Sequence, residues 1–175
     1  QMAEHAVDGN KLIGMVQSNQ KTDENGKAEV YNIGCVGYIE FHSKTPDGRY
    51  LINLKGISRF KIKKEINTNN LYRKFSVDYN DFLSDFDEQE TKEINTIELI
   101  EKTKKLFEQY QLSTNWKVVE KVETEQLINS LSMICPFTIS EKQRLLETKD
   151  LVDRNEILNK IINFYFLGNN ENNKN

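Results

Sequence analysis

Two Ser-x-x-Lys spacings are the closest approach to a catalytic motif in the sequence: Ser18 with Lys21, and Ser58 with Lys61. In serine–lysine hydrolases the lysine amine activates the serine hydroxyl, which requires both side chains on one helical turn. Ser58 and Lys61 fall in a predicted strand, where residues three apart point to opposite faces. Ser18 and Lys21 fall in a predicted polar loop. We interpret both spacings as chance and predict no catalytic residues.

The histidines and carboxylates do not form a metal or catalytic pattern. His5 and His42 are the only histidines, and no third ligand stands at the spacing that zinc requires. Acidic pairs such as Glu88 with Glu90 occur where helices are predicted to begin, and there they complement the helix dipole. The sequence has no G-x-x-x-x-G-K-[ST] phosphate loop. We therefore expect neither a bound metal nor a cofactor.

Five apolar side chains are candidates for binding a polypeptide. Such a site needs exposed apolar or aromatic surface with a polar rim. Tyr31 lies beside a predicted loop, and Tyr38 is out of phase with the apolar residues of its strand. The others lie in a connector between two predicted lobes: Phe82, Leu83 and Phe86. The competing interpretation is that each of them packs inside the protein, with the connector residues joining the lobes.

The stretch from Ile33 to Ile66 predicts three strands joined by two turns. A period of two, typical of a strand with one buried face, appears in three successive sets. The sets are Cys35, Gly37, Ile39 and Phe41; Tyr50, Ile52 and Leu54; and Phe60 and Ile62. The first two sets are separated by the turn sequence Thr45-Pro46-Asp47-Gly48. Gly56 predicts a bulge or a sharp corner before the third.

Shorter elements flank this stretch. We expect the end of a helix closed by Gly9, a strand over Lys11 to Gln17, a long mobile hairpin loop from Ser18 to Glu29, and a strand over Tyr72 to Tyr79. Helical periodicity begins at Glu88, with Asp87 as a candidate N-cap. Three more helices are predicted: from Trp116 or Glu123 to Ile134, from a capping box at Ser140 through Glu147, and from Asp150 to Gly168.

Strands followed by helices predict an α+β fold. We expect a β lobe over residues 1–80, a helical lobe over 81–168 and a disordered tail over 169–175. The net charge of −3 leaves no basic face of the kind that nucleic-acid binding requires. Two cysteines make no disulfide framework, and no signal peptide or membrane-spanning run is visible, so a cytoplasmic location without membrane attachment is expected.

The motifs in this chain resemble those of the Lon N-terminal domain family. The strand G-C-V-G-Y-I-E, the turn P-D-G-R-Y and the segment G-I-S-R-F carry the resemblance, which continues into I-C-P-F-T-I-S-E-K-Q-R-L-L-E. That family provides the substrate-binding domain of the ATP-dependent protease La and also occurs as short standalone bacterial proteins. The resemblance implies an antiparallel or mixed PUA-like β pseudo-barrel followed by a bundle of about four helices. Arg59 matches an arginine of the family, and we expect it to form a salt bridge that fixes the strand.

The front of the chain departs from the family pattern. Family members begin with strands rich in leucine and proline, whereas here M-A-E-H-A-V resembles the helix that follows them. A pseudo-barrel without those strands exposes unpaired edges, through which a homo-oligomer would form. The resemblance implies a non-catalytic module or adaptor that binds unfolded polypeptide or a protein partner. The alternatives are a nucleic-acid-binding pseudo-barrel, or a peptidase in family name only.

Overall fold

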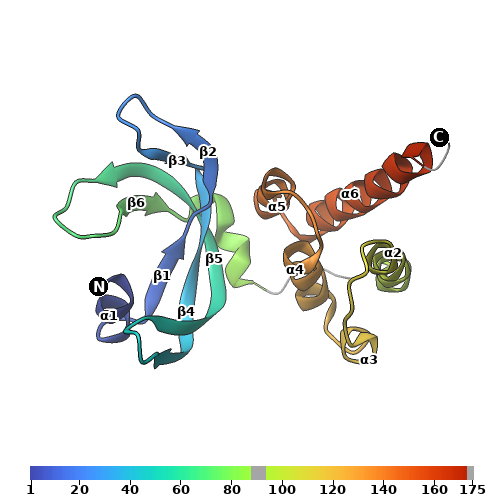
Figure 1. The fold of residues 1–175 in the computed structure, drawn as a ribbon, viewed down its shortest axis with the longest axis horizontal. Helices are drawn as coiled ribbons and strands as arrows, with labels where there is room; N and C mark the ends of the chain where they lie inside the picture. The colour runs from blue at the N-terminus through green and yellow to red at the C-terminus, as the bar shows by residue number, and fades with distance from the viewer. Residues whose placement is uncertain (88–93, 173–175) are drawn as a thin grey trace. The chain divides into compact units, whose positions relative to one another are not determined.

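The computed structural model describes residues 1–87 and 94–172, with side chains described as far as residue 166 (Figure 1). Contacts divide the chain into two compact units, Gln1–Glu88 and Gln89–Asn175. Among the described residues, every strand lies in the first unit, and the second unit is built from helices. The α+β fold class is therefore confirmed.

The first unit contains a four-stranded antiparallel sheet in the order β1-β4-β5-β6. Its strands are β1 (Leu12–Met15), β4 (Ile33–Lys44), β5 (Tyr50–Ile66) and β6 (Lys74–Asp78). Within the described residues, β1 and β6 are the edges of this sheet. A barrel closes only when its edge strands pair, so the sheet is open and the expected pseudo-barrel is not a closed one.

β4 and β5 form one long hairpin instead of the three strands expected from alternation. The turn is as predicted: Gly48 has φ 82° and donates its N–H to the Thr45 carbonyl at 2.9 Å. β5 then continues through Gly56 without a corner. Gly56 pairs with Gly37 while Ser58 pairs with Val36, so Ile57 is an extra residue in the ladder. The bulge interpretation of Gly56 is thus correct and the third strand is wrong.

The hairpin expected over Ser18 to Glu29 is present, but most of the segment forms strands and only its turn is a loop. β2 (Ser18–Thr22) pairs with β3 (Ala28–Val30) as a separate two-stranded sheet. Gly26 takes φ 76° in the turn, and Asp23 Oδ1 accepts the N–H of Lys27 at 2.9 Å. Side-chain to backbone hydrogen bonds from polar residues stabilise this hairpin. Its strands therefore lack the alternation of apolar residues by which a strand is predicted from sequence.

One face of the main sheet is buried by the first helix. α1 (Met2–Val7) places Ala6 against Ile13 and Ile39, and all three are buried. Glu4 of the same helix contacts Lys44 of β4 at 3.5 Å. After β6, the 3₁₀ helix η1 (Asn80–Phe86) packs on β5 and buries Phe82.

The second unit has five helices between residues 94 and 172, against about four expected. They are α2 (Thr96–Gln109), α3 (Trp116–Val119), α4 (Thr124–Ile134), α5 (Ile139–Leu146) and α6 (Leu151–Asn172). Their apolar faces form a core that includes Leu99, Leu106, Ile128, Leu131, Leu158 and Ile162. α6 continues past Gly168 to Asn172, so the predicted helix end at Gly168 is wrong. Residues 173–175 lie outside the described part.

The helix caps correct two sequence predictions and confirm one. Asn95, and not Asp87, caps α2 by accepting the N–H of Glu98 at 3.1 Å; the predicted start at Glu88 lies outside the described residues. α5 has its capping box at Thr138 and Glu141, with Ser140 already inside the helix. Asp150 caps α6 as predicted, since its Oδ1 accepts the N–H of Asp153 at 2.9 Å.

Candidate functional site

Four exposed apolar side chains lie on the face of the main sheet opposite α1. This apolar sheet face consists of Leu12 (38% exposed), Tyr38 (38%), Phe41 (55%) and Leu51 (61%). They come from β1, β4 and β5. Exposed apolar side chains gathered on one surface are typical of an interaction site, whereas single ones need no explanation.

The strand register places these four residues on one face. Paired residues of antiparallel strands point to the same side of a sheet. Leu12 pairs with Tyr38, and Tyr38 pairs with Lys55. In the next rows Phe41 pairs with Asn53, and Ser43 pairs with Leu51. Lys55, Asn53 and Leu51 alternate along β5, so the three rows share a face on which polar side chains separate the apolar ones.

A bulge in β4 brings Phe41 to this face. Ile39 pairs with Leu54 and Phe41 with Asn53, so Glu40 is an extra residue in the strand. Alternation without the bulge predicts that Phe41 points to the same side as Ile39, into the core. In the structure Ile39 is 2% exposed and Phe41 is 55% exposed. Alternation in the sequence therefore places Phe41 on the buried face, and no local sequence signal reveals the bulge that exposes it.

The structure separates the five predicted binding residues. Tyr38 belongs to the apolar sheet face, and Tyr31 lies half-buried just before β4. Phe82 is only 5% exposed. Leu83 and Phe86 are 58% and 60% exposed on η1. Because a 3₁₀ helix has three residues per turn, Leu83 and Phe86 lie on one side of η1.

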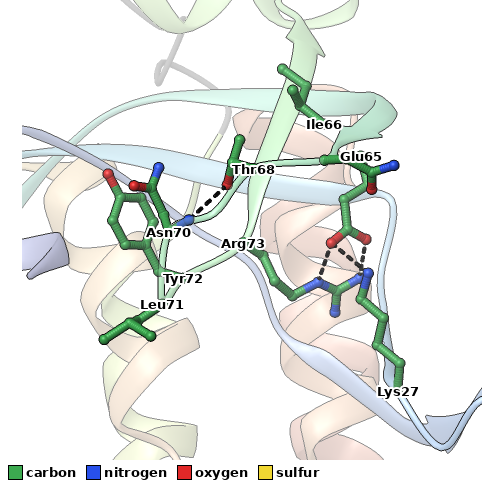
Figure 2. Close-up of a pocket in the computed structure, with 9 residues that line it drawn as sticks. Lys27, Glu65, Ile66, Thr68, Asn70, Leu71, Tyr72 and Arg73 are labelled. Atoms are coloured by element: carbon green, nitrogen blue, oxygen red, sulfur yellow. Dashed lines mark hydrogen bonds and ion pairs between the residues drawn. The ribbon is translucent and has the colours of Figure 1, made fainter.

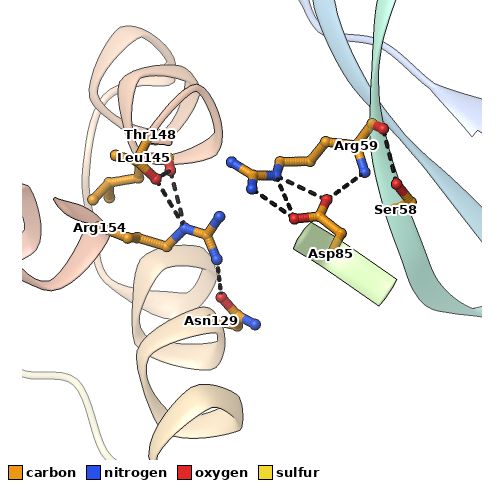
Figure 3. Close-up of polar contacts among 7 residues, drawn as sticks. All are labelled: Ser58, Arg59, Asp85, Asn129, Leu145, Thr148 and Arg154. Carbon is orange, nitrogen blue, oxygen red and sulfur yellow. Dashed lines mark hydrogen bonds and ion pairs between the residues drawn. The ribbon is translucent and has the colours of Figure 1, made fainter. Parts of the chain in front are cut away.

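Two arginines hold elements together, one within each unit (Figure 3). Arg59 of β5 binds Asp85 of η1 through Nη2 at 2.6 Å and through its backbone N–H at 2.8 Å. The guanidinium also lies 4.5 Å from the centre of the Phe82 ring. This confirms the salt bridge expected of Arg59. In the helical unit, Arg154 donates to the Leu145 carbonyl at 3.1 Å and to Thr148 Oγ1 at 3.2 Å.

A pocket of about 310 Å³ is lined by the end of β5, by the segment that connects β5 to β6, and by Lys27 of the β2–β3 hairpin (Figure 2). Glu65 occupies its wall and binds Lys27 at 2.6 Å and Arg73 at 2.6 Å. The hydrogen bond from Arg73, followed by that from Lys27, lowers the pKa of Glu65 to about 2. Arg73 also donates to the Ala28 carbonyl at 2.6 Å. These charges already hold the hairpin to β5, so we do not assign a ligand to this pocket.

The side chains that could act as nucleophiles or bases, Cys135, Ser58 and Lys61, are buried or engaged in structural contacts. Burial raises the pKa of the Cys135 thiol to about 12, which keeps it protonated. Ser58 is buried and donates to the Arg59 carbonyl at 3.0 Å, while Lys61 pairs with Asp81 at 3.3 Å. In residues 1–87 and 94–172, no group of three or more His, Cys, Asp or Glu could hold a metal ion.

The sheet unit and the helical unit define an α+β domain of the kind found at the front of Lon proteases. The N-terminal domain of the Mycobacterium avium complex Lon protease matches 87% of this chain and 89% of its own, with a TM-score of 0.53 and 13% identity. The Lon N-terminal domain protein from Xanthomonas campestris gives a TM-score of 0.51 over 86% and 88% of the two chains, also at 13% identity.

Residues 1–163 match the family described as the ATP-dependent protease La (LON) substrate-binding domain. The chain belongs to this family. Its relatives include the Lon proteases of Malacoplasma penetrans (30% identical over 165 residues) and Dictyoglomus thermophilum (25% over 153 residues). Each alignment covers 87% of this chain but only 20% and 19% of these relatives, so the chain spans about a fifth of their length. No helix among the described residues combines the length and apolar character needed to span a bilayer.

Proposed function

We propose that this domain captures unfolded segments of polypeptide without transforming them, and that the apolar sheet face is where they bind. Membership of the substrate-binding domain family supports this function. One observation leads us to place the site on this surface. Four apolar side chains share one face of the sheet, and each is at least 38% exposed: Leu12, Tyr38, Phe41 and Leu51.

The chemistry of this face suits apolar segments of varied sequence. Removing apolar surface from water contributes about 25 cal/mol per Å², so several partly exposed side chains contribute a few kcal/mol together. Lys55 and Asn53 lie between them and can bond to carbonyl groups of a bound chain. Leu83 and Phe86 on η1 form a second, smaller apolar surface.

Thermal unfolding with and without a reduced, alkylated polypeptide at two salt concentrations tests this proposal. A ligand that binds the native state raises the unfolding temperature by mass action, and apolar capture persists at high salt. Phe41→Ser and Leu51→Ser should each reduce the shift. Leu71→Ser is the matched control, because Leu71 is 90% exposed in the same unit but lies outside the apolar sheet face. If only Leu83→Ser and Phe86→Ser reduce the increase in unfolding temperature, the polypeptide binds at η1 and not at the apolar sheet face.

Self-association is a second candidate, favoured by the edge positions of β1 and β6. Sedimentation over a wide concentration range tests it, and a constant monomeric mass would contradict it. RNA is expected to give no shift that survives physiological salt. We further propose a cytoplasmic setting, in which the free cysteines Cys35 and Cys135 stay reduced.

A further inference from the structure

The turn of the β2–β3 hairpin carries the one Asn-Gly pair of the sequence, Asn25-Gly26. This pair is favoured in hairpin turns, because both residues tolerate a positive φ. It also has a chemical reactivity that the turn does not need. The side-chain amide of an asparagine can be attacked by the backbone nitrogen of the next residue, and a glycine leaves that nitrogen unhindered because it has no side chain.

The reacting atoms of this pair are accessible. Asn25 and Gly26 are both exposed, and a Cβ added to Gly26 would meet no atom within 4 Å. The side-chain amide of Asn25 has no hydrogen-bond partner among the residues whose side chains are described. The Gly26 N–H donates to the Asp23 carbonyl at 3.0 Å, a single bond in an exposed turn that opens by local fluctuation.

The reaction converts the amide into a carboxylate and consumes only water. The Gly26 nitrogen loses its proton to hydroxide and forms a bond to Cγ of Asn25. The bond from Cγ to Nδ2 breaks, and ammonia leaves with a proton taken from water, which regenerates the hydroxide. Water then opens the cyclic imide at either of its carbonyl carbons. One opening gives aspartate, and the other gives isoaspartate, in which the backbone passes through the former side chain.

Isoaspartate lengthens a loop whose ends are bonded together. Asp23 donates its N–H to the Lys27 carbonyl at 2.9 Å, and Asp23 Oδ1 accepts the Lys27 N–H at 2.9 Å. These bonds position Lys27, whose Nζ lies 2.6 Å from the Glu65 carboxylate of β5 (Figure 2). Because the length of a hairpin loop determines its geometry, an additional backbone carbon between Asp23 and Lys27 disrupts this closure. The product therefore weakens a contact that fastens the hairpin to β5.

We propose that Asn25 is a modification site, at which spontaneous loss of the side-chain amide and formation of isoaspartate loosen the β2–β3 hairpin from β5. The hairpin is loosened and not unfolded, because Arg73 still binds Glu65 and the Ala28 carbonyl, each at 2.6 Å. Since ammonia is lost to the solvent, the change accumulates with the age of the molecule.

Peptide mapping by mass spectrometry tests the modification in the folded protein. Incubation at mildly alkaline pH uses conditions in which a synthetic peptide of residues 18–30 converts. The Asn25 peptide should gain the mass difference between an amide and a carboxylic acid, and an isoaspartate-specific methyltransferase should then methylate it.

Two controls accompany this measurement. Asn67 should keep its amide, because it is also exposed, in the loop after β5, but precedes Thr68, whose branched side chain hinders the attack. Asn25→Gln should abolish the mass gain. An Asn25 that stays unmodified in the folded protein would overturn the proposal, as would conversion of Asn67 at the same rate.

Hydrogen exchange tests the structural consequence. In the isoaspartate fraction, separated by ion exchange, the Lys27 amide should exchange about fivefold faster, as expected for loss of its hydrogen bond to Asp23. The amides of β4 should exchange as before. Asn25→Asp adds the charge without the additional backbone carbon and should leave Lys27 exchange unchanged. Unchanged exchange in the isoaspartate fraction would overturn the loosening of the hairpin. Equal acceleration in Asn25→Asp would assign the effect to charge and overturn the role of isoaspartate.

Discussion

At the scale of single residues, Arg59 shows how one side chain can hold an element in place. Its side chain is 5% exposed and binds Asp85, whose side chain is 17% exposed. A charge at this depth is stable only when it is paired. The pair joins β5 to η1, the helix that presents Leu83 and Phe86.

Asp85→Ala should therefore destabilise the sheet unit strongly. Removing one partner of a buried pair costs about 3 kcal/mol, because the remaining charge stays buried. Asp81→Ala is the matched control: its pair with Lys61 is 3.3 Å long and more than half exposed on both sides, so its loss should change stability by about 0.5 kcal/mol. Urea unfolding of the two variants measures the difference, and equal midpoints would contradict this role of Arg59.

Glu65 predicts a pH dependence at the same scale. Its pKa falls from 4.5 to about 2 through the hydrogen bonds from Arg73 and Lys27. A carboxylate with a lowered folded-state pKa stabilises the fold fully above its unfolded pKa, and this stabilisation is lost as the pH falls through the folded value. The stability gap between the parent and Glu65→Gln should be constant above about pH 5 and shrink towards pH 2. Unfolding midpoints across that range measure it, and a gap that widens on acidification would refute the assignment.

At the scale of elements, alternation, turn chemistry and Gly56 predict most strands and one of the two bulges between β4 and β5. The Thr45–Gly48 turn and the edges of the hairpin follow from local residue preferences. The extra residue Glu40 in the other bulge has no such signal, because its place is decided by pairing with the partner strand. The sequence pattern therefore places Phe41 on the buried face, whereas it identifies Tyr38, which precedes the bulge, as a candidate. Half of the apolar sheet face, Leu12 and Leu51, depends on a register that local sequence does not encode.

The N-cap of α5 shows that the position of a cap, like that of a bulge, is not fixed by a local sequence motif. The Ser140-Glu141-Lys142-Gln143 sequence has capping-box form, but in the structure Thr138 accepts the N–H of Glu141 at 3.3 Å, and Glu141 accepts that of Thr138 at 2.8 Å. Thr138→Ala should lower the free energy of unfolding by about 1 kcal/mol, whereas Ser140→Ala should change it by a few tenths. Chemical denaturation distinguishes them, and a larger effect of Ser140→Ala would restore the cap predicted from sequence.

At the scale of the whole molecule, the two units contribute different things. The largest apolar core of the described residues lies in the helical unit, and all four residues of the apolar sheet face lie in the sheet unit. The sequence predicted this division of strands and helices well, because it follows from a change of hydrophobic period along the chain. A net charge of −3 also agrees with binding by apolar contact.

Stability and binding should therefore respond to different substitutions. Leu158 is 0% exposed in the helical core, so Leu158→Ala should lower the free energy of unfolding by about 3 kcal/mol. Its affinity for the unfolded polypeptide, measured well below its unfolding temperature, should be unchanged, since the proposed site lies wholly within the first unit. Leu51→Ser should do the reverse, with about tenfold weaker binding and a change in stability of about 0.5 kcal/mol or less, because Leu51 is 61% exposed. Measuring both quantities for both variants separates the roles. Loss of binding in folded Leu158→Ala would contradict a site confined to the sheet unit and would require contacts from the helices.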